Sequence, residues 1–280
     1  MGAPRISASN LQRVWLCPPS PWREAAMPDQ AGEKPAADEG RKLHAAVVSV
    51  YRNGDFTGLN SEQRAVVRRC VTLIRFHEGR FDEKPLIWME QDFPVPALGG
   101  HKVHPDVVVR FQEARTTVLL DWKMGRKEPQ FTVARDLQFW CYTLATWHNV
   151  SDGHTIEAYR FHPRLSADDA LWEGRFNPED REAFDAKVRD IVAKAGPGAQ
   201  AVAGPAQCLY CDARASCREF LKWSWEDRPT KLMVVNAALP PERIGMLLDY
   251  REQLKLAGAM MEQVEAFFKE NLLPKRDNIF

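Results

Sequence analysis

Three charged residues near the middle of the chain have the types and the spacing of a hydrolytic metal site. Asp106 is followed fifteen residues later by Asp121, and Lys123 completes an Asp-x-Lys motif. Two carboxylates offer the hard oxygen ligands that Mg²⁺ and Mn²⁺ prefer. Such a metal lowers the pKa of a bound water and neutralises the charge that develops when a phosphodiester is attacked, while a lysine ammonium orients the water. The three residues therefore predict metal-dependent hydrolysis of a phosphodiester.

The residues around this motif predict how the three side chains come together. Apolar runs follow Asp106 and precede Asp121, and such runs are typical of strands that are buried on both faces. Residues two apart on a strand share a face, so Asp121 and Lys123 point the same way and Trp122 points into the opposite layer. Asp106, on the neighbouring strand of a hairpin, joins them. The alternative is a turn residue and an exposed strand end, since short motifs of this kind also arise by chance.

Helical and strand patterns alternate around the motif. Apolar spacing and capping residues predict helices over 7–16, 39–52, 61–80, 133–147, 178–195 and 241–273. Runs rich in β-branched residues and bounded by turn residues predict strands over 86–95, 102–111, 116–122 and 155–164. This order of elements predicts an α/β core with helical flanks.

A second candidate metal site lies towards the C-terminal end of the sequence. Cys208, Cys211 and Cys217 supply three thiols within ten residues, and a closed tetrahedral site needs one more ligand. Thiolates suit an iron–sulfur cluster or a structural Zn²⁺, whereas a disulfide framework is unexpected in a cytosolic chain. The alternative is that these thiols are ordinary buried or solvated side chains. Cys70 and Cys141 fall on apolar helix faces and are expected in the core.

Composition indicates the class of protein but does not select a substrate. The 280 residues are 45% hydrophobic and 27% charged, which is typical of a soluble globular protein. The chain has no run of 18 apolar residues and no charged-then-apolar leader, so we expect a cytoplasmic protein with no membrane partner. Lys plus Arg equal Asp plus Glu at 38 each, which gives no overall reason to expect nucleic acid. A metal-dependent hydrolase with another substrate therefore stays an alternative.

Several short motifs occur in the order of a known family. They are Ser7-x-Ser9 leading to Cys17-Pro18, Glu39-Gly40 followed by His44, the Asp106 and Asp121-x-Lys123 pair, Gln138-x-x-x-Tyr142, and the three C-terminal cysteines. Over Ser7 to Cys217 the chain resembles the RecB-type branch of the PD-(D/E)XK nucleases. This branch includes the AddB nuclease domain, CRISPR-associated RecB-like exonucleases and phage-encoded relatives. One departure is His104, because the branch usually has glycine two residues before the aspartate.

The resemblance implies both a fold and an activity. The fold would be an α/β, restriction-endonuclease-like core with a central mixed β-sheet flanked by helices, over residues 1–220 and closed by a four-cysteine cluster. The last sixty residues match nothing in the family, and the amphipathic pattern over 241–273 predicts that residues 221–280 form a helical C-terminal extension. The activity would be that of a Mg²⁺- or Mn²⁺-dependent deoxyribonuclease. It would act as an exonuclease on single strands or DNA ends in phage or bacterial recombination or repair, with a helicase or recombination protein as a partner.

The resemblance also assigns roles to individual residues. The metal ligands would be His44, Asp106, Asp121 and the backbone carbonyl of Trp122. Gln138 and Tyr142 share a helical face and would contact DNA and order the active site beside the catalytic Asp106, Asp121 and Lys123, although a helix face packed on the sheet would look the same. Glu90 on the first strand is either a support for the metal site or an exposed strand carboxylate.

Cys17 would be the fourth thiolate beside Cys208, Cys211 and Cys217, because it occupies the family's N-terminal cysteine position. The resemblance favours a four-iron four-sulfur cluster over Zn²⁺. Closing so long a loop would constrain the unfolded chain strongly and make the site a structural staple. An alternative function is a catalytically silent DNA-binding recombination-accessory module with the same fold, against which the intact Asp106, Asp121 and Lys123 set argues.

Overall fold

The computed structural model describes residues 4–27, 35–125, 132–166, 170–209 and 211–226. The chain divides into two compact units. One, which we name the cysteine unit, comprises Met1–Arg5, Arg13–Pro28 and Lys194–Phe280. The other, the sheet unit, comprises Ile6–Gln12 and Asp29–Ala193.

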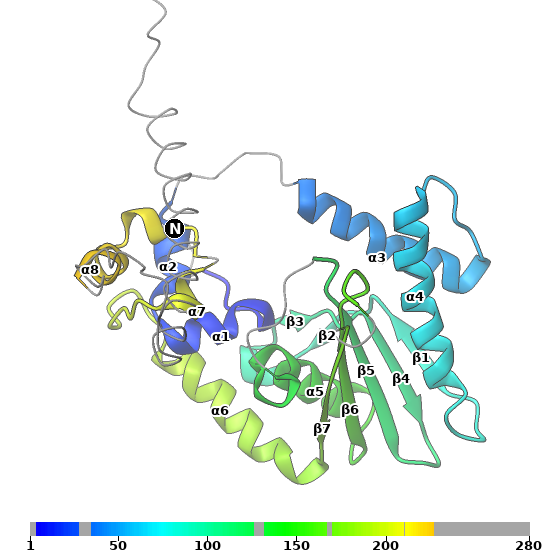
Figure 1. Cartoon of the computed structure of the whole chain (residues 1–280). Helices are drawn as coiled ribbons and strands as arrows, with labels where there is room; N and C mark the ends of the chain where they lie inside the picture. The colour runs from blue at the N-terminus through cyan, green and yellow to red at the C-terminus, as the bar shows by residue number, and fades with distance from the viewer. Residues whose placement is uncertain (1–3, 28–34, 126–131, 167–169, 210, 227–280) are drawn as a thin grey trace, which may run out of the picture. The chain divides into compact units, whose positions relative to one another are not determined.

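A five-stranded mixed sheet forms the centre of the sheet unit, with strand order β1-β4-β5-β6-β7. Strands β5 and β6 run parallel, and every other neighbouring pair in this sheet is antiparallel (Figure 1). A parallel pair needs a crossover, and helix α5 provides it. The strands are β1 Leu86–Met89, β4 Val107–Phe111, β5 Thr116–Trp122, β6 Thr155–Phe161 and β7 Leu171–Phe176, while β2 Phe93–Pro94 and β3 Lys102–Val103 form a separate two-stranded sheet.

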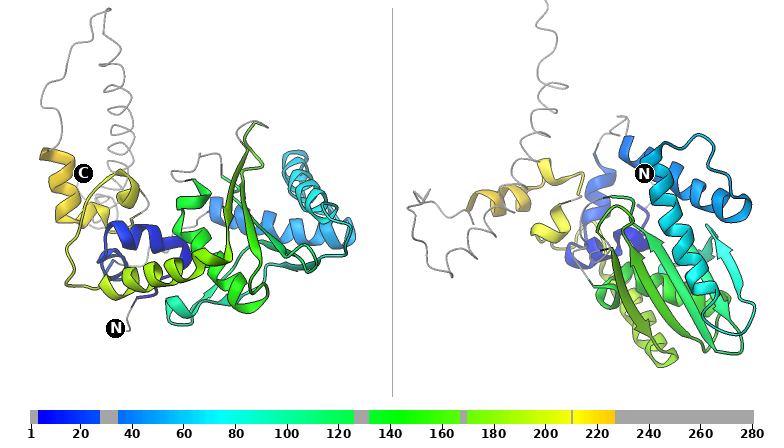
Figure 2. Two further views of the ribbon diagram at one scale, coloured as in Figure 1. Left: turned by 90° about the horizontal axis from the view of Figure 1, so that it is seen from below. Right: turned by 45° about the vertical axis from the view of Figure 1, so that its right-hand side comes forward.

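Helices lie on both faces of the central sheet. Helices α3 (Pro35–Asn53) and α4 (Ser61–Glu78) cover one face, and α5 (Leu137–Asn149) lies on the other (Figures 1 and 2). Helix α6 packs on α5 through stacked rings, with ring centroids of Trp140 and Phe184 4.2 Å apart. The remaining helical elements are α1 Ala8–Leu16, α2 Ser20–Ala25, α6 Arg181–Lys194, α7 Pro205–Cys208 and α8 Arg218–Glu226, with 3-10 turns at Pro96–Leu98, Val133–Arg135 (η2), Pro178–Asp180 and Arg214–Ser216.

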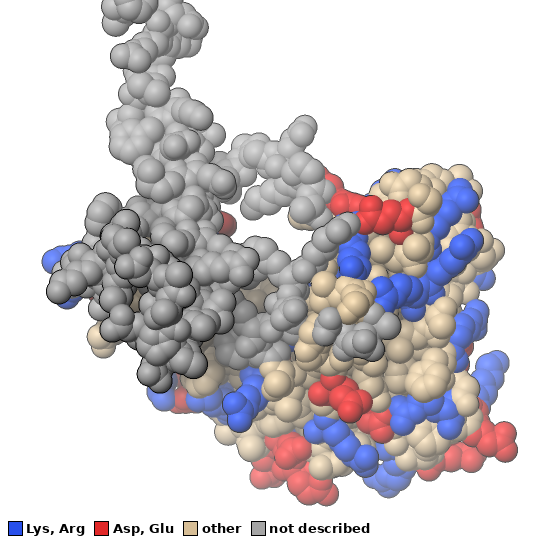
Figure 3. All heavy atoms as spheres, viewed as in Figure 1, with Lys and Arg blue, Asp and Glu red and all other residues tan. Residues whose placement is uncertain are grey.

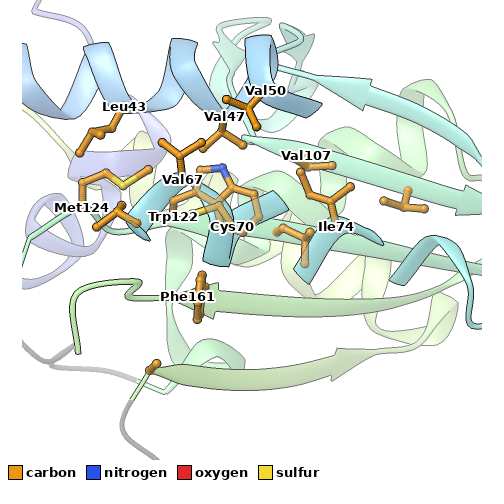
Figure 4. Close-up of a cluster of buried hydrophobic side chains, with 14 of the residues drawn as sticks. Leu43, Val47, Val50, Val67, Cys70, Ile74, Val107, Trp122, Met124 and Phe161 are labelled. Atoms are coloured by element: carbon orange, nitrogen blue, oxygen red, sulfur yellow. The ribbon is translucent and has the colours of Figure 1, made fainter. Parts of the chain in front are cut away.

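A large hydrophobic core lies between the sheet and helices α3 and α4. Alternate residues of β4 and β5 face these helices, and among them Trp122 is only 2% exposed. Burying a side chain of this size stabilises the fold by roughly 1.5–3 kcal/mol. Figure 4 shows side chains from both helices meeting those of the strands around Trp122. The members labelled there are Leu43, Val47, Val50, Val67, Cys70, Ile74, Val107, Trp122, Met124 and Phe161.

These elements confirm the predicted α/β class with a mixed sheet flanked by helices. The predicted strands over 86–95 and 102–111 are wrong in extent, because each is broken into two short strands of different sheets. Helix α3 begins at Pro35, earlier than the predicted start at residue 39. Strand β7 was not predicted, because its residues mostly alternate between exposed and half-buried and form no apolar run. The helix predicted over 241–273 lies outside the described residues, as does most of the predicted extension over 221–280.

The surface of the sheet unit carries charges of both signs. Figure 3 shows Lys and Arg side chains intermixed with Asp and Glu on the face turned to the viewer, in keeping with the zero net charge. Within the described residues, no helix combines the length and the apolar character that crossing a membrane requires.

Candidate active site

The two aspartates lie opposite each other at one end of the β4–β5 hairpin. Val107 pairs with Leu120, so Asp106, immediately before β4, faces Asp121 in β5. Both side chains are almost fully buried, with 4% of Asp106 and 3% of Asp121 exposed. The Asp106 carboxylate also accepts a hydrogen bond from the backbone N–H of Trp122, which ties this side chain to the end of β5. The hairpin register therefore brings the two predicted carboxylates together.

His44 on α3 reaches the same place from the helical layer. Its Nδ1 lies 3.0 Å from an oxygen of Asp106 and 3.2 Å from an oxygen of Glu90. One ligand atom from each of these three residues lies within 4.8 Å of the others. Burial disfavours the imidazolium, but hydrogen bonds and charges of Asp106 and Glu90 outweigh it and raise the pKa of His44 to about 10. His44, which was predicted as a metal ligand from the Glu39-Gly40 motif, therefore faces Asp106.

Two carboxylates buried close together repel each other when both are charged, and a bound cation would offset this repulsion. Burial raises the pKa of the Asp106 carboxyl, the hydrogen bond from His44 opposes that effect, and the charge of Asp121 adds to it. The Oδ2 atom of Asp121 is buried, and the nearby Lys123 ammonium forms an ion pair with it. Carboxylate oxygens beside an imidazole fit a divalent metal by donor type.

A chain of polar contacts connects the carboxylates to helix α5. The ammonium of Lys123 lies 2.8 Å from Asp121 Oδ2 as an ion pair, and it donates to Gln138 Oε1 over 3.3 Å. The amide of Gln138 in turn donates to the Tyr142 hydroxyl over 2.6 Å. The Asp136 side chain caps the start of α5 by accepting from the Gln138 backbone N–H, which fixes the first turn. The structure thus gathers Lys123, Gln138 and Tyr142 around Asp121.

Trp122 separates the polar site from the core. Its ring packs among the side chains of α3, α4 and Phe161, on the opposite face from Asp121 and Lys123. This is the orientation that the strand alternation predicts. Trp122 lies between Asp121 and Lys123 in the sequence, and its backbone carbonyl is the one expected to bind the metal.

The sequence did not single out His104 and Asp92 as site residues. His104 Nε2 lies 2.7 Å from Glu90 Oε2, and its Nδ1 lies 3.0 Å from Asp92 Oδ1. Glu90 itself was weighed either as a support for the metal site or as an exposed carboxylate, and it contacts His44. The available signal was the departure of His104 from the glycine that the resembling branch usually has two residues before the aspartate that corresponds to Asp106.

The four clustered cysteines all belong to the cysteine unit, where residues from both ends of the sequence meet. Burial raises the pKa of the Cys17 and Cys208 thiols, and the thiols of Cys17, Cys208 and Cys217 also influence one another electrostatically. The Arg23 guanidinium donates to Cys217 Sγ over 2.9 Å. Among the described residues, no three of these sulfur atoms all lie within 4.8 Å of one another.

Cys70 and Cys141, by contrast, are fully buried in the sheet unit, which confirms the prediction that they are core residues.

Comparison with known proteins gives matches of two kinds. The family model of the PD-(D/E)XK nuclease superfamily matches residues 58–218. Among solved structures, an alkaline exonuclease (LHK-Exo) from Laribacter hongkongensis shares 14% identity and a TM-score of 0.33, over 68% of this chain and 84% of that chain. Its complex with dAMP shares 14% identity and a TM-score of 0.29, over 65% and 89%. A comparison with curated proteins found no match.

The family match spans the strands and the helix that form the central site. The matched residues include Asp106, Asp121, Lys123, Gln138 and Tyr142, and they extend over more than half of the chain. With its mixed sheet flanked by helices and its paired carboxylates beside a lysine, this chain belongs to the PD-(D/E)XK nuclease superfamily.

Proposed function

We propose that this protein is a Mg²⁺- or Mn²⁺-dependent deoxyribonuclease. The observation that carries the proposal is the meeting of Asp106 and Asp121 across the β4–β5 ladder, with the Lys123 ammonium 2.8 Å from Asp121. His44, Asp106, Asp121 and the Trp122 carbonyl would hold the metal. When bound there, the metal supplies an activated water and neutralises charge on the phosphate.

The residues of the chain then have separate tasks. Lys123, held between Asp121 and Gln138, orients the attacking water and stabilises the negative charge that develops on the phosphate oxygens. The Gln138 amide is fixed by its hydrogen bond to Tyr142, so the lysine keeps one position. Gln138 and Tyr142 also present polar groups to a bound DNA strand.

The finer assignment follows the motifs that the chain shares with the RecB-type branch. We propose an exonuclease that acts on single strands or DNA ends in phage or bacterial recombination or repair, with a helicase or recombination protein as a partner. Support comes from the order of the motifs from Ser7 to Cys217. On the face shown in Figure 3, Lys and Arg side chains are intermixed with Asp and Glu. Contact with DNA phosphates would therefore depend on local basic groups.

Cleavage assays with matched variants test this function. We expect end-labelled single- and double-stranded DNA to be cut with Mg²⁺ or Mn²⁺ and not with a chelator, and circular single strands to resist an exonuclease. Asp121→Asn, Asp106→Asn and Lys123→Met should each lower the rate at least about 100-fold, the equivalent of a few kcal/mol. Glu113→Gln, an equivalent change at an exposed carboxylate, should have no effect.

The asparagine variants are chosen because the Asp106 carboxylate also accepts the Trp122 N–H, and an amide oxygen keeps that acceptor. Cleavage by Asp121→Asn at the wild-type rate would show that the site is misassigned. DNA binding without cleavage by the wild-type protein would favour the alternative, a catalytically silent accessory module.

We further propose that Cys17, Cys208, Cys211 and Cys217 hold a four-iron four-sulfur cluster, with Zn²⁺ as the alternative. Support comes from the cysteine positions that the chain shares with the RecB-type branch. Protein prepared without oxygen should be brown, with absorbance near ~400 nm from thiolate-bound iron. Cys17→Ser should lose the metal, and Cys70→Ala, a control in the core, should keep it. A colourless protein with one zinc per chain would decide for the alternative.

A further inference from the structure

Glu90 lies between two histidines beside the proposed metal site. One carboxylate oxygen is 3.2 Å from His44 Nδ1, and the other is 2.7 Å from His104 Nε2. The second ring nitrogen of His104 is 3.0 Å from Asp92 Oδ1. A line of contacts thus runs from Asp92 through His104 and Glu90 to His44, which also contacts Asp106 over 3.0 Å.

The backbone at Glu90 is held in a conformation that side chains seldom adopt. Glu90 follows directly after strand β1, and its φ is +52°. This is the left-handed region of backbone conformation, which is usually occupied by glycine. A non-glycine residue held there costs of order 1–3 kcal/mol. The Glu90 N–H donates to the Asp106 carbonyl oxygen over 2.9 Å, so this turn is fastened directly to the residue that carries the catalytic carboxylate.

The chemistry of the three nearest groups is that of a metal site. Ligand atoms of His44, Glu90 and Asp106 lie within 4.8 Å of one another. A purely structural ion pair does not need this convergence or the strained backbone, and half-exposed pairs contribute little to stability. The side chain of Glu90 is 27% exposed and that of His104 48%, so the line of contacts runs along the rim of the site.

We propose that Glu90 is a further protein ligand of the divalent metal, and that His104, itself held by Asp92, is the positioning residue that orients the Glu90 carboxylate. The proposal rests on the proposed function, since it concerns the same metal. Metal-binding side chains commonly need a hydrogen-bonded partner that fixes their orientation. His104 supplies that partner at the position where the resembling branch usually has glycine.

Mn²⁺ binding to the metal-free protein tests the proposal without relying on activity. The loss of the free Mn²⁺ signal in electron paramagnetic resonance gives the dissociation constant for the wild type and each variant. We expect Glu90→Gln to weaken Mn²⁺ binding about 10–100-fold, and His104→Ala about tenfold. His104→Gln, whose amide can still donate to Glu90, should recover part of the loss. Glu113→Gln is the exposed control and should bind like the wild type.

A thermal melt separates a ligand from a structural residue. With a chelator present, Glu90→Gln and His104→Ala should have melting temperatures close to that of the wild type, because each change removes only contacts at the rim of the site. Added Mn²⁺ should raise the melting temperature of the wild type by linkage, and should do so less for Glu90→Gln at the same concentration.

The outcomes distinguish this inference from the proposed function. Wild-type Mn²⁺ affinity in Glu90→Gln would overturn the ligand role while the loss of binding in Asp121→Asn kept the site itself. Wild-type affinity in His104→Ala, with weak binding in Glu90→Gln, would overturn the positioning role alone. Wild-type binding and cleavage in Asp121→Asn would overturn the proposed function.

Discussion

Acid should destabilise the sheet unit through His77, a buried histidine that is not part of the proposed site. His77 of α4 is 1% exposed, and neither of its ring nitrogens has a hydrogen-bond partner among the described residues. Its ring packs on Tyr159 of β6, with centroids 4.6 Å apart. Burial and the nearby charge of Arg80 lower its pKa to about 4, and Glu157 opposes this shift weakly.

The sign and size of the effect follow from the two pKa values. In the unfolded chain the imidazole titrates near 6.5, whereas in the folded protein it stays neutral down to about 4. Between these values the unfolded state binds more protons, so the stability that is present above about pH 6.5 is lost as the pH falls towards 4. At about 1.4 kcal/mol for each pH unit, the full loss is about 3 kcal/mol. About 2 kcal/mol of it falls between pH 7 and pH 5.

The assay compares urea unfolding of the wild type and His77→Phe near neutral pH and near pH 5. Phenylalanine keeps an aromatic ring against Tyr159 and has no proton to gain. On going from the higher to the lower pH, the free energy of unfolding of the variant should rise by about 2 kcal/mol relative to the wild type. The reason is that only the wild type has an unfolded state that is stabilised by taking up a proton at position 77. His148→Phe, at an exposed position of α5, is the control and should show no such gain. An equal stability difference at both pH values would refute the reasoning.

Three further changes should destabilise the fold by amounts that thermal or urea unfolding can measure. Gly174→Ala should cost about 1–3 kcal/mol, because a Cβ there would lie 2.8 Å from a side-chain atom of η2, while Gly198→Ala meets open space and should cost little. Asp136→Ala should cost at least about 1 kcal/mol, since it removes the cap of α5 and an ion pair with the buried Arg160; an unchanged melting temperature would contradict this. Leu119→Ala, at a fully buried β5 position, should cost about 2–5 kcal/mol, and a loss below about 1 kcal/mol would mean that the site collapses freely.

The parts of the site that lie on regular strands could be predicted from the sequence. Strand β5 has the predicted bounds, Thr116–Trp122, because a run buried on both faces leaves an unambiguous pattern. Once β5 and its hairpin partner are known, alternation and register place Asp106, Asp121 and Lys123 together. The helix carrying Gln138 and Tyr142 was likewise predicted, over 133–147, but the α-helix begins only at Leu137, after the Asp136 cap, and ends at Asn149.

The rim of the site could not be predicted in this way. Glu90 and His104 meet because one backbone turn has a positive φ and the other contains a proline, and neither conformation has a periodic signature. The sequence instead suggested long strands through both positions. Partners that lie far apart along the chain and on irregular backbone become visible only when the fold brings them together.

The left-handed turn at Glu90 has a consequence for engineering. Glycine adopts φ near +52° without penalty, so any selection or design scheme that rewards stability alone would replace Glu90 by glycine or asparagine. A thermostable variant obtained in this way would keep the fold and the hairpin carboxylates while losing the rim of the site. Under the ligand role proposed above, glutamate at this position gives up some stability for metal binding, so screens for robust variants should hold residue 90 fixed.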